Sequence, residues 1–315
     1  ESDKKLIRIL YTGDIRFHGG LGTTIDQYVK DVGEGIDVMI CEGTRIDSES
    51  RLTEKEVKEK IKQEIQNTKS LAFVDFSWKD TTRYETIREA SEESNRIFII
   101  NSRLAYLLNK LGNEKLPPSV KVFLKRKSSC LYSPADYSKD KHEYGYSTDW
   151  ENDKDSSHYT QGITAEEVKR QPEKYVLMMS YFDLNQLFDL ADKNGKLPGS
   201  RFIKAVCEPF CDEMELDEER LINWLDTFEI KFTEGEPEIP SECTYNNCTK
   251  IKKRIERAHV SGHASKPELI ELITKLKPKK VIPVHTEHPE VFEGELRDTN
   301  IEVIVPESGK SIEIG

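Results

Sequence analysis

Two carboxylates follow apolar runs near the start of the chain, where they could bind a metal or transfer a proton. Asp14 ends the run in KLIRILYTGD, and Glu42 ends the run in GIDVMICE. Strand ends are the places where α/β folds commonly display catalytic groups. Carboxylates at such places are also common caps and turn formers, and Thr44 beside Glu42 fits that alternative. Neither carboxylate alone decides between these roles.

Two histidines flank an amphipathic stretch near the other end, in VSGHASKPELIELITKLKPKKVIPVHTEH. His285 follows the apolar run KKVIPV, and a neutral imidazole is a common metal ligand. His263 precedes the tetrapeptide SKPE, a capping box that predicts a helix start, so this histidine also fits a purely structural place. Ser261 and Gly262 come just before that helix, where backbone N–H groups and a hydroxyl can bind an anion.

Helices and strands alternate in the rest of the chain. The first 50 residues predict strand, loop and strand, and residues 53–112 predict helix, strand, helix, strand and helix. Further strands are predicted at 174–182, 201–207 and 301–306, with a helix at 217–228. This alternation is typical of a parallel sheet flanked by helices, so we expect an α/β fold. Residues 128–162 show no apolar period and predict a long loop.

Composition limits the class of protein. Charged residues make up 33% of the 315 residues and the formal net charge is −11, which excludes a uniformly basic nucleic-acid-binding surface. No apolar run approaches the roughly 18 residues of a membrane span, and no signal peptide begins the chain, so we expect a cytoplasmic protein without membrane contact. Six cysteines are too few for a disulfide scaffold. The pairs Cys207/Cys211 and Cys243/Cys248 leave open a structural zinc site or free thiols.

Two basic runs could bind a polyanion locally despite this acidic average, although each also fits a solvated helix face. They contain Lys121, Lys125, Arg126 and Lys127 in the first run, and Lys250, Lys252, Lys253, Arg254 and Arg257 in the second. A loop after a predicted strand carries three more residues that could touch a nucleic-acid backbone or stack on a base: Ser77, Trp78 and Arg83.

Four motifs in this order resemble the metallo-β-lactamase superfamily, and within it the β-CASP nucleases that are similar to ribonuclease J. The motifs are YTGDIRFHG, ICEGTRI, HVSGHAS and KKVIPVHTEH. The resemblance covers nearly the whole chain and implies a partial metallo-β-lactamase αββα fold. Residues 1–50 and 249–315 would form the metallo-β-lactamase domain, and residues 51–248 would form the inserted β-CASP domain.

The resemblance implies a role for each candidate residue. Asp14 matches an aspartate that bridges two zinc ions, and His285 matches a late histidine ligand of one zinc. His263 matches a histidine that protonates the leaving oxygen, with Glu42 to orient it. Ser261, with Gly262 beside it, matches a phosphate-contacting position. The implied function is hydrolysis of RNA phosphodiesters with two zinc ions.

The chain departs from the family pattern in one respect. The family has a His-x-His-x-Asp-His signature before the bridging aspartate, but only thirteen residues precede Asp14 and all seven histidines follow it. We therefore expect the chain to correspond to the C-terminal two-thirds of such a nuclease, and to hold little zinc and be inactive alone. The missing N-terminal segment, as a separate chain, or a second copy would then cover exposed apolar sheet surface. Two alternatives remain: a metallo-β-lactamase-fold hydrolase of a small substrate, and a non-catalytic RNA-binding or scaffold protein.

Overall fold

The computed structural model describes residues 6–17, 23–49, 53–112, 116–125, 161–209, 211–235 and 253–314. It divides into two compact units, one made of Glu1–Glu54 with Val260–Gly315 and the other of Lys55–His259. The first unit therefore combines the two ends of the chain. The sequence placed the domain boundaries at residues 50/51 and 248/249, and the structure divides the chain at residues 54/55 and 259/260.

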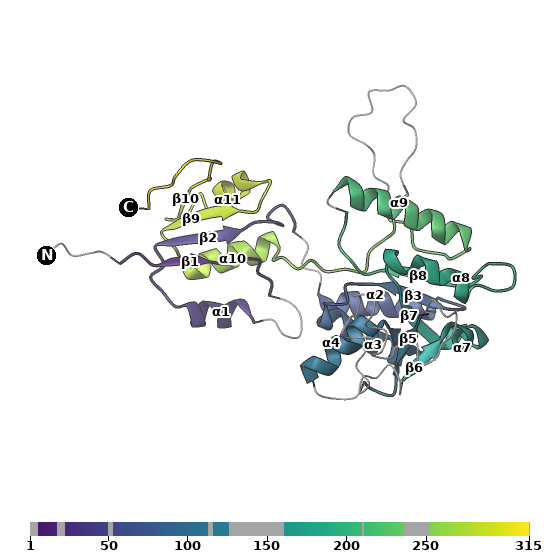
Figure 1. Ribbon diagram of the computed structural model, residues 1–315. Helices are drawn as coiled ribbons and strands as arrows, with labels where there is room; N and C mark the ends of the chain where they lie inside the picture. Colours follow the sequence, from purple (N-terminus) through teal and green to yellow (C-terminus); the bar gives the residue numbers. More distant parts are fainter. Residues whose placement is uncertain are drawn as a thin grey trace, which may run out of the picture. The chain divides into compact units, whose positions relative to one another are not determined.

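A four-stranded parallel sheet forms the centre of the first unit within the described residues, in the order β1-β2-β9-β10. Figure 1 shows the purple N-terminal strands beside the yellow C-terminal strands in this sheet. The strands are β1 (Ile9–Tyr11), β2 (Val38–Glu42), β9 (Lys280–Val284) and β10 (Glu302–Val303). The pairing of β2 with β9 aligns Glu42 with Val284, so the carboxyl ends of strands from opposite ends of the chain lie side by side.

Helices cover one face of this sheet. Helix α1 (Ile25–Val32), helix α10 (Lys266–Leu276) and helix α11 (Pro289–Glu295) share one apolar core with Met39 and Val281. Successive side chains of a strand point to opposite faces, so Ile9 and Tyr11 lie on the other face from Leu10, which packs on this core. Ile9 and Tyr11 are 51% and 67% exposed, so β1 presents apolar surface to solvent.

The sequence predicted helix α10 through its capping box, and the structure confirms the helix. The Glu268 carboxylate accepts hydrogen bonds from the backbone N–H and the hydroxyl of Ser265, at 2.8 and 2.7 Å. Its buried side chains recur at the helical spacing, namely Leu269, Leu272, Ile273 and Leu276.

Helix α1 corrects the prediction of a loop between the first two strands. Thr24 caps it, because the Thr24 hydroxyl accepts the Gln27 N–H at 3.1 Å. Ile25, Tyr28 and Val29 pack against the core of the first unit without being fully buried. The segment is only eight residues long, and this short amphipathic period was missed.

The second unit is built on a six-stranded parallel sheet in the order β6-β5-β4-β7-β3-β8, counted within the described residues. The strands are β3 (Ala72–Asp75), β4 (Ile97–Ile100), β5 (Val120–Leu124), β6 (Gly162–Thr164), β7 (Tyr175–Met178) and β8 (Arg201–Lys204). The helices include α2 (Glu54–Gln66), α3 (Thr81–Glu93), α4 (Ser102–Gly112), α7 (Ala165–Arg170), α8 (Leu187–Leu190) and α9 (Asp212–Thr227). All four residues of β3 are buried, as expected for a parallel strand covered on both faces. The predicted α/β class is confirmed.

Some sequence interpretations of the second unit were wrong or fall outside the described residues. Where it is described, the first basic run is not a helix face, because Lys121 lies in strand β5 beside the buried Val122 and Phe123. Strand β6 and helix α7 were not predicted. Of the predicted loop 128–162, only residues 161 and 162 are described.

The second basic run is extended rather than helical where it is described. Its backbone runs beside β8, with the Ala258 N–H donating to the Lys204 carbonyl at 2.8 Å. Arg254 and Arg257 bond the buried carboxylate of Glu218 at 3.3 and 2.7 Å. With side chains only 13% and 10% exposed, these two arginines stabilise the second unit and do not offer an open surface to RNA.

Candidate active site

Three carboxyl ends of neighbouring parallel strands form the site in the first unit. Asp14 follows β1, Glu42 ends β2 and His285 follows β9, and these strands are adjacent in the order β1-β2-β9. Parallel strands end at the same edge of a sheet, so the topology gathers these three side chains. His263 comes from the loop that leads into α10.

Glu42 is the buried anchor of the site. Its side chain is 2% exposed, and its two oxygens accept the N–H groups of Ile15 at 3.0 Å and Thr44 at 3.2 Å. The same carboxylate lies 3.0 Å from Nδ1 of His263. A carboxylate only accepts hydrogen bonds, so Nδ1 of His263 carries a proton, and Nε2 is the ring nitrogen left for other chemistry.

The loop that carries His263 is tied to the loop after β1. The Ala264 N–H donates to the Ile15 carbonyl at 2.7 Å, and the His263 N–H donates to the Ser261 hydroxyl at 3.2 Å. An added Cβ at Gly262 would meet nothing within 4 Å, so open space lies beside this glycine. The contact with Glu42 holds the His263 ring, and the side chain is still 23% exposed, so a substrate can reach it.

Asp14 and His285 form the exposed half of the site. Asp14 Oδ1 and His285 Nδ1 are 3.6 Å apart, with side chains 68% and 64% exposed. His285 has a φ of +53°, a left-handed conformation that is uncommon for a residue other than glycine. Its ring centroid is 5.8 Å from that of His263, and the rings meet edge to face at 76°. The structure therefore brings together the side chains of the candidate catalytic and metal-binding residues Asp14, Glu42, His263 and His285.

Thr44 is a site residue whose contact with His285 the sequence did not reveal. Its hydroxyl lies 3.3 Å from Nδ1 of His285, while its backbone N–H bonds Glu42. It therefore connects the buried carboxylate to the exposed histidine. The only sequence signal was its place two residues after Glu42, which also fits a simple cap.

Gly43 lies where strand β2 passes close to helix α11, next to Glu42 and Thr44. An added Cβ there would lie 2.7 Å from a ring carbon of Phe292, which is fully buried, and 3.0 Å from Cβ of Thr286. Its N–H donates to the Val284 carbonyl at 3.0 Å, which holds β2 against β9 beside the site. A glycine is therefore required by this close approach.

The donor chemistry of Asp14 and His285 fits part of a zinc shell. Carboxylate oxygen and imidazole nitrogen both ligate zinc, and protein zinc sites are usually four-coordinate. Across the described ranges, no group of three or more His, Cys, Asp or Glu side chains could hold a metal ion. These two residues thus supply two suitable donors, and a complete shell needs others.

Other residues singled out from the sequence lie elsewhere. Cys243 and Cys248 are outside the described residues, as is His18 in the motif YTGDIRFHG. Cys207 and Cys211 are free, exposed thiols. Arg83 is only 2% exposed and donates to the Ala258 carbonyl at 2.6 Å, so the prediction that Arg83 touches nucleic acid was wrong.

The remaining described histidines stay outside the four-residue cluster. His259 belongs to the second unit, where burial lowers the pKa of its ring, with a smaller lowering from Arg83. His288 is 48% exposed and lies 3.2 Å from Glu290. His259 therefore has a packing role, and His288 contacts solvent.

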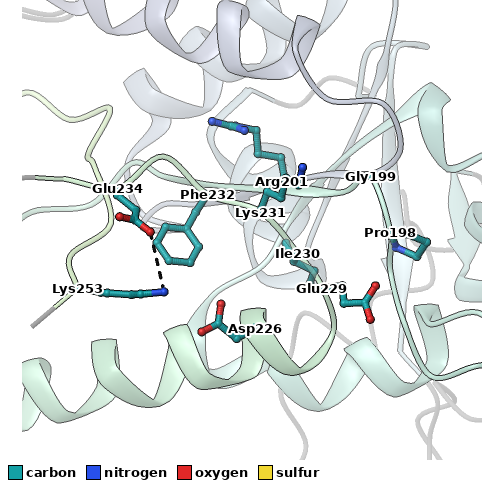
Figure 2. A pocket seen from close by; sticks show the side chains of 10 residues that line it. All are labelled: Pro198, Gly199, Arg201, Asp226, Glu229, Ile230, Lys231, Phe232, Glu234 and Lys253. Carbon is teal, nitrogen blue, oxygen red and sulfur yellow. Dashed lines mark ion pairs between the residues drawn. The ribbon is translucent and has the colours of Figure 1, made fainter.

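A cavity of about 520 Å³ in the second unit is distinct from the histidine site. Figure 2 shows side chains of both charges around it, including an ion pair of Glu234 with Lys253 at 3.9 Å. It lies at the amino end of β8, beside Arg201, whereas ligands of open α/β sheets usually bind at the carboxyl ends. Arg201 is already paired with Glu64 and Thr233. We therefore assign no function to this cavity.

A known protein family matches part of the chain, namely the segment that contains His263 and His285. Residues 249–306 match the Zn-dependent metallo-hydrolase RNA specificity domain. Ser261, Gly262, His263 and His285 lie inside this stretch, and the two carboxylates lie outside it. This stretch is therefore similar to a zinc-dependent metallo-hydrolase domain with RNA specificity, and the similarity supports the metallo-β-lactamase context of the motifs.

A solved structure is similar to this chain, and because only 18% of the residues are identical, the similarity shows the fold alone. The crystal structure of a protein of unknown function from Enterococcus faecalis V583 matches with a TM-score of 0.59 and 18% sequence identity. The match covers 96% of this chain and 57% of that chain, so this chain spans little more than half the length of its structural relative. No curated protein matches the chain. In the part of the chain that the structure describes, no helix is both long and apolar enough to cross a membrane.

Proposed function

We propose that the first unit carries the active site of a zinc-dependent ribonuclease of the β-CASP type, similar to ribonuclease J. The observation that carries this proposal is the pair of buried Glu42 and partly buried His263, 3.0 Å apart, beside the exposed Asp14–His285 pair. A proton-transfer pair next to side chains that can ligate a metal is an arrangement suited to phosphodiester hydrolysis. The match of residues 249–306 to an RNA specificity domain supports RNA as the substrate.

In this proposal the chain's own residues divide the chemistry. Glu42 orients His263 through Nδ1 and stabilises the charged ring, so Nε2 can protonate the leaving oxygen. The Ser261 hydroxyl and the open space at Gly262 receive a phosphate of the substrate. Asp14 and His285 hold zinc, which when bound supplies Lewis acidity toward phosphoryl oxygens and activates water at neutral pH.

A further protein segment completes the zinc site in this proposal. Two donors are too few for the two zinc ions expected, because protein zinc sites are usually four-coordinate, and the 51% and 67% exposed side chains of Ile9 and Tyr11 leave apolar sheet surface uncovered. We propose that a segment packing on this face, from another chain or from elsewhere in the full-length protein, provides the remaining ligands. The free thiols of Cys41, Cys207 and Cys211 suit a reducing compartment, so we propose the cytoplasm as the location.

A turnover experiment separates this function from its alternatives. The full-length protein, purified with any chain that accompanies it and loaded with zinc, is incubated with 5′-monophosphorylated RNA and with small esters. We expect zinc-dependent cleavage of RNA. Turnover of the esters alone would identify a small-substrate hydrolase, and RNA binding without cleavage under all metal conditions would identify a non-catalytic RNA-binding protein.

A further inference from the structure

A row of alternating aromatic and basic side chains lies on the second unit, outside the histidine site. It comprises Trp78, Lys79, Arg103, Tyr106 and Lys110, which we call the α4 patch. The Lys79 ammonium and the Arg103 guanidinium each lie 5.5 Å from the centre of the Trp78 ring. The Lys110 ammonium lies 5.2 Å from the centre of the Tyr106 ring. Every ring in the row therefore has a cation beside it.

Trp78 and Arg103 of the α4 patch lie where open α/β sheets usually bind ligands. Trp78 follows the carboxyl end of β3, and Arg103 follows that of β4, while β7 lies between these strands in the sheet. The chain continues from β4 to β5 on one side and from β7 to β8 on the other, so the strand order reverses between β4 and β7. Such a reversal point, at the carboxyl ends, is the usual ligand crevice of this architecture.

Local hydrogen bonds fix the backbone under the α4 patch. The Asp80 N–H donates to the Ser77 carbonyl at 2.9 Å, and the Asp80 carboxylate accepts the Arg83 N–H at 3.0 Å as the cap of α3. The Asn101 side chain likewise accepts the Leu104 N–H at 2.8 Å at the start of α4. Trp78 and Arg103 are therefore presented from two ordered turns.

Helix α4 differs in charge from the chain as a whole. Helix α4 contains Arg103 and Lys110 and no acidic residue, in a protein with a net charge of −11. Arg103, Tyr106 and Lys110 are spaced three and four residues apart, so they share one helix face over about 10 Å. The two rings of the patch are half-buried and its three cations are exposed. Such a surface suits a single strand of nucleic acid, because bases stack on rings and phosphates pair with cations.

We propose that the α4 patch binds single-stranded RNA, with a base stacked on Trp78 and phosphates held by Lys79, Arg103 and Lys110. This inference deepens the proposed function, since it assigns substrate binding to the second unit. It does not depend on zinc or on hydrolysis. An RNA that binds but is not cleaved would refute the proposed nuclease and leave this binding site standing.

Binding of a ten-nucleotide single-stranded RNA to the full chain, measured in EDTA, tests the proposal. The wild-type protein should show quenched tryptophan fluorescence on binding, and Trp78→Phe should remove most of that quenching with less than about threefold loss of affinity. Trp78→Ala should weaken binding roughly ten- to hundredfold, because the stacked ring is lost. Trp224→Phe is the fluorescence control and should leave the quenching unchanged.

Salt dependence tests the cations separately. Arg103→Ala combined with Lys110→Ala should reduce the slope of log Kd against log salt by about 1.4, as expected for two lost phosphate contacts. Lys169→Ala combined with Lys193→Ala removes the same charge from exposed positions elsewhere in the unit and should leave the slope nearly unchanged.

Three results would overturn the proposal: no quenching by RNA, equal affinities of the Trp78→Ala and control proteins, or equal salt slopes of the two double variants. Polyglutamate that competed as well as RNA would show an acidic-protein contact instead. Circular dichroism verifies that each variant is folded, and Trp78→Phe keeps the test decisive should Trp78→Ala fail to fold.

Discussion

At the scale of single residues, burial separates two kinds of carboxylate in one site. Glu42 is 2% exposed and bonded to two backbone N–H groups and a histidine, whereas Asp14 is 68% exposed. A buried carboxylate with all its oxygens engaged is suited to orienting a partner. An exposed one is suited to binding an ion or ligand that arrives from outside.

We expect Glu42→Gln to lower the free energy of unfolding by about 1–3 kcal/mol. Glutamine keeps one acceptor oxygen and turns an amide N–H₂ toward Ile15 or Thr44, so one buried N–H loses its partner. Asp14→Asn is the matched control and should change the unfolding free energy by less than about 0.5 kcal/mol, because its side chain is exposed. Urea unfolding of both variants measures the difference. Equal effects would show that Glu42 is not held as described.

The buried carboxyl of Asp75 should make the stability of the second unit depend on pH. Burial raises the pKa of this carboxyl from 3.8 to about 6, partly offset by the attraction of Lys204 beside it on β8. The folded chain therefore binds this proton more tightly than the unfolded chain does. Its contribution to the free energy of unfolding falls as the pH rises from about 4 through about 6, by about 3 kcal/mol in total.

Replacing Asp75 by Asn should remove this component of the pH dependence, since the amide does not ionise. Urea unfolding between pH 4 and pH 8 compares the wild type with Asp75→Asn. Asp226→Asn, an exposed position, serves as the control and should keep the wild-type slope. An Asp75→Asn curve parallel to the wild type would mean that the carboxyl is not protonated preferentially in the folded state.

At the scale of elements, local patterns predicted best where a single segment determines its own structure. The SKPE capping box and the apolar spacing after it identified α10, and the apolar runs identified β2, β3 and β9. Helix α1 was missed because it is short and no residue in it is fully buried. The contact of Thr44 with His285 was not predictable, because it depends on the pairing of β2 with β9 across most of the chain.

A substitution of Gly43 tests how closely β2 approaches α11. We expect Gly43→Ala to lower the free energy of unfolding by about 1–3 kcal/mol, since its Cβ would overlap the buried Phe292 ring. Gly262→Ala adds the same methyl group where nothing lies within 4 Å, so it should change stability by less than about 0.5 kcal/mol. Thermal or urea unfolding measures both. Equal stability of the two variants would contradict the packing described here.

At the scale of the whole molecule, the site exists because the two ends of the chain fold into one unit. Asp14 and Glu42 come from the first segment, and His263 and His285 come from the last. Periodicity and propensity do not reveal such a long-range pairing. The order of the four motifs did indicate it, through resemblance to a family. The roles of the four residues stay predictions, because geometry brings them together without showing what they bind.

The most direct test of the central claim compares His285→Ala with His263→Ala in the zinc-loaded full-length protein. We expect His285→Ala to lose zinc, measured by metal analysis. We expect His263→Ala to keep its zinc, while kcat for RNA cleavage falls roughly 10²–10⁴-fold through loss of the proton donor. Equal zinc loss in both variants would make His263 a metal ligand, and unchanged RNA cleavage in both would contradict the account of this site.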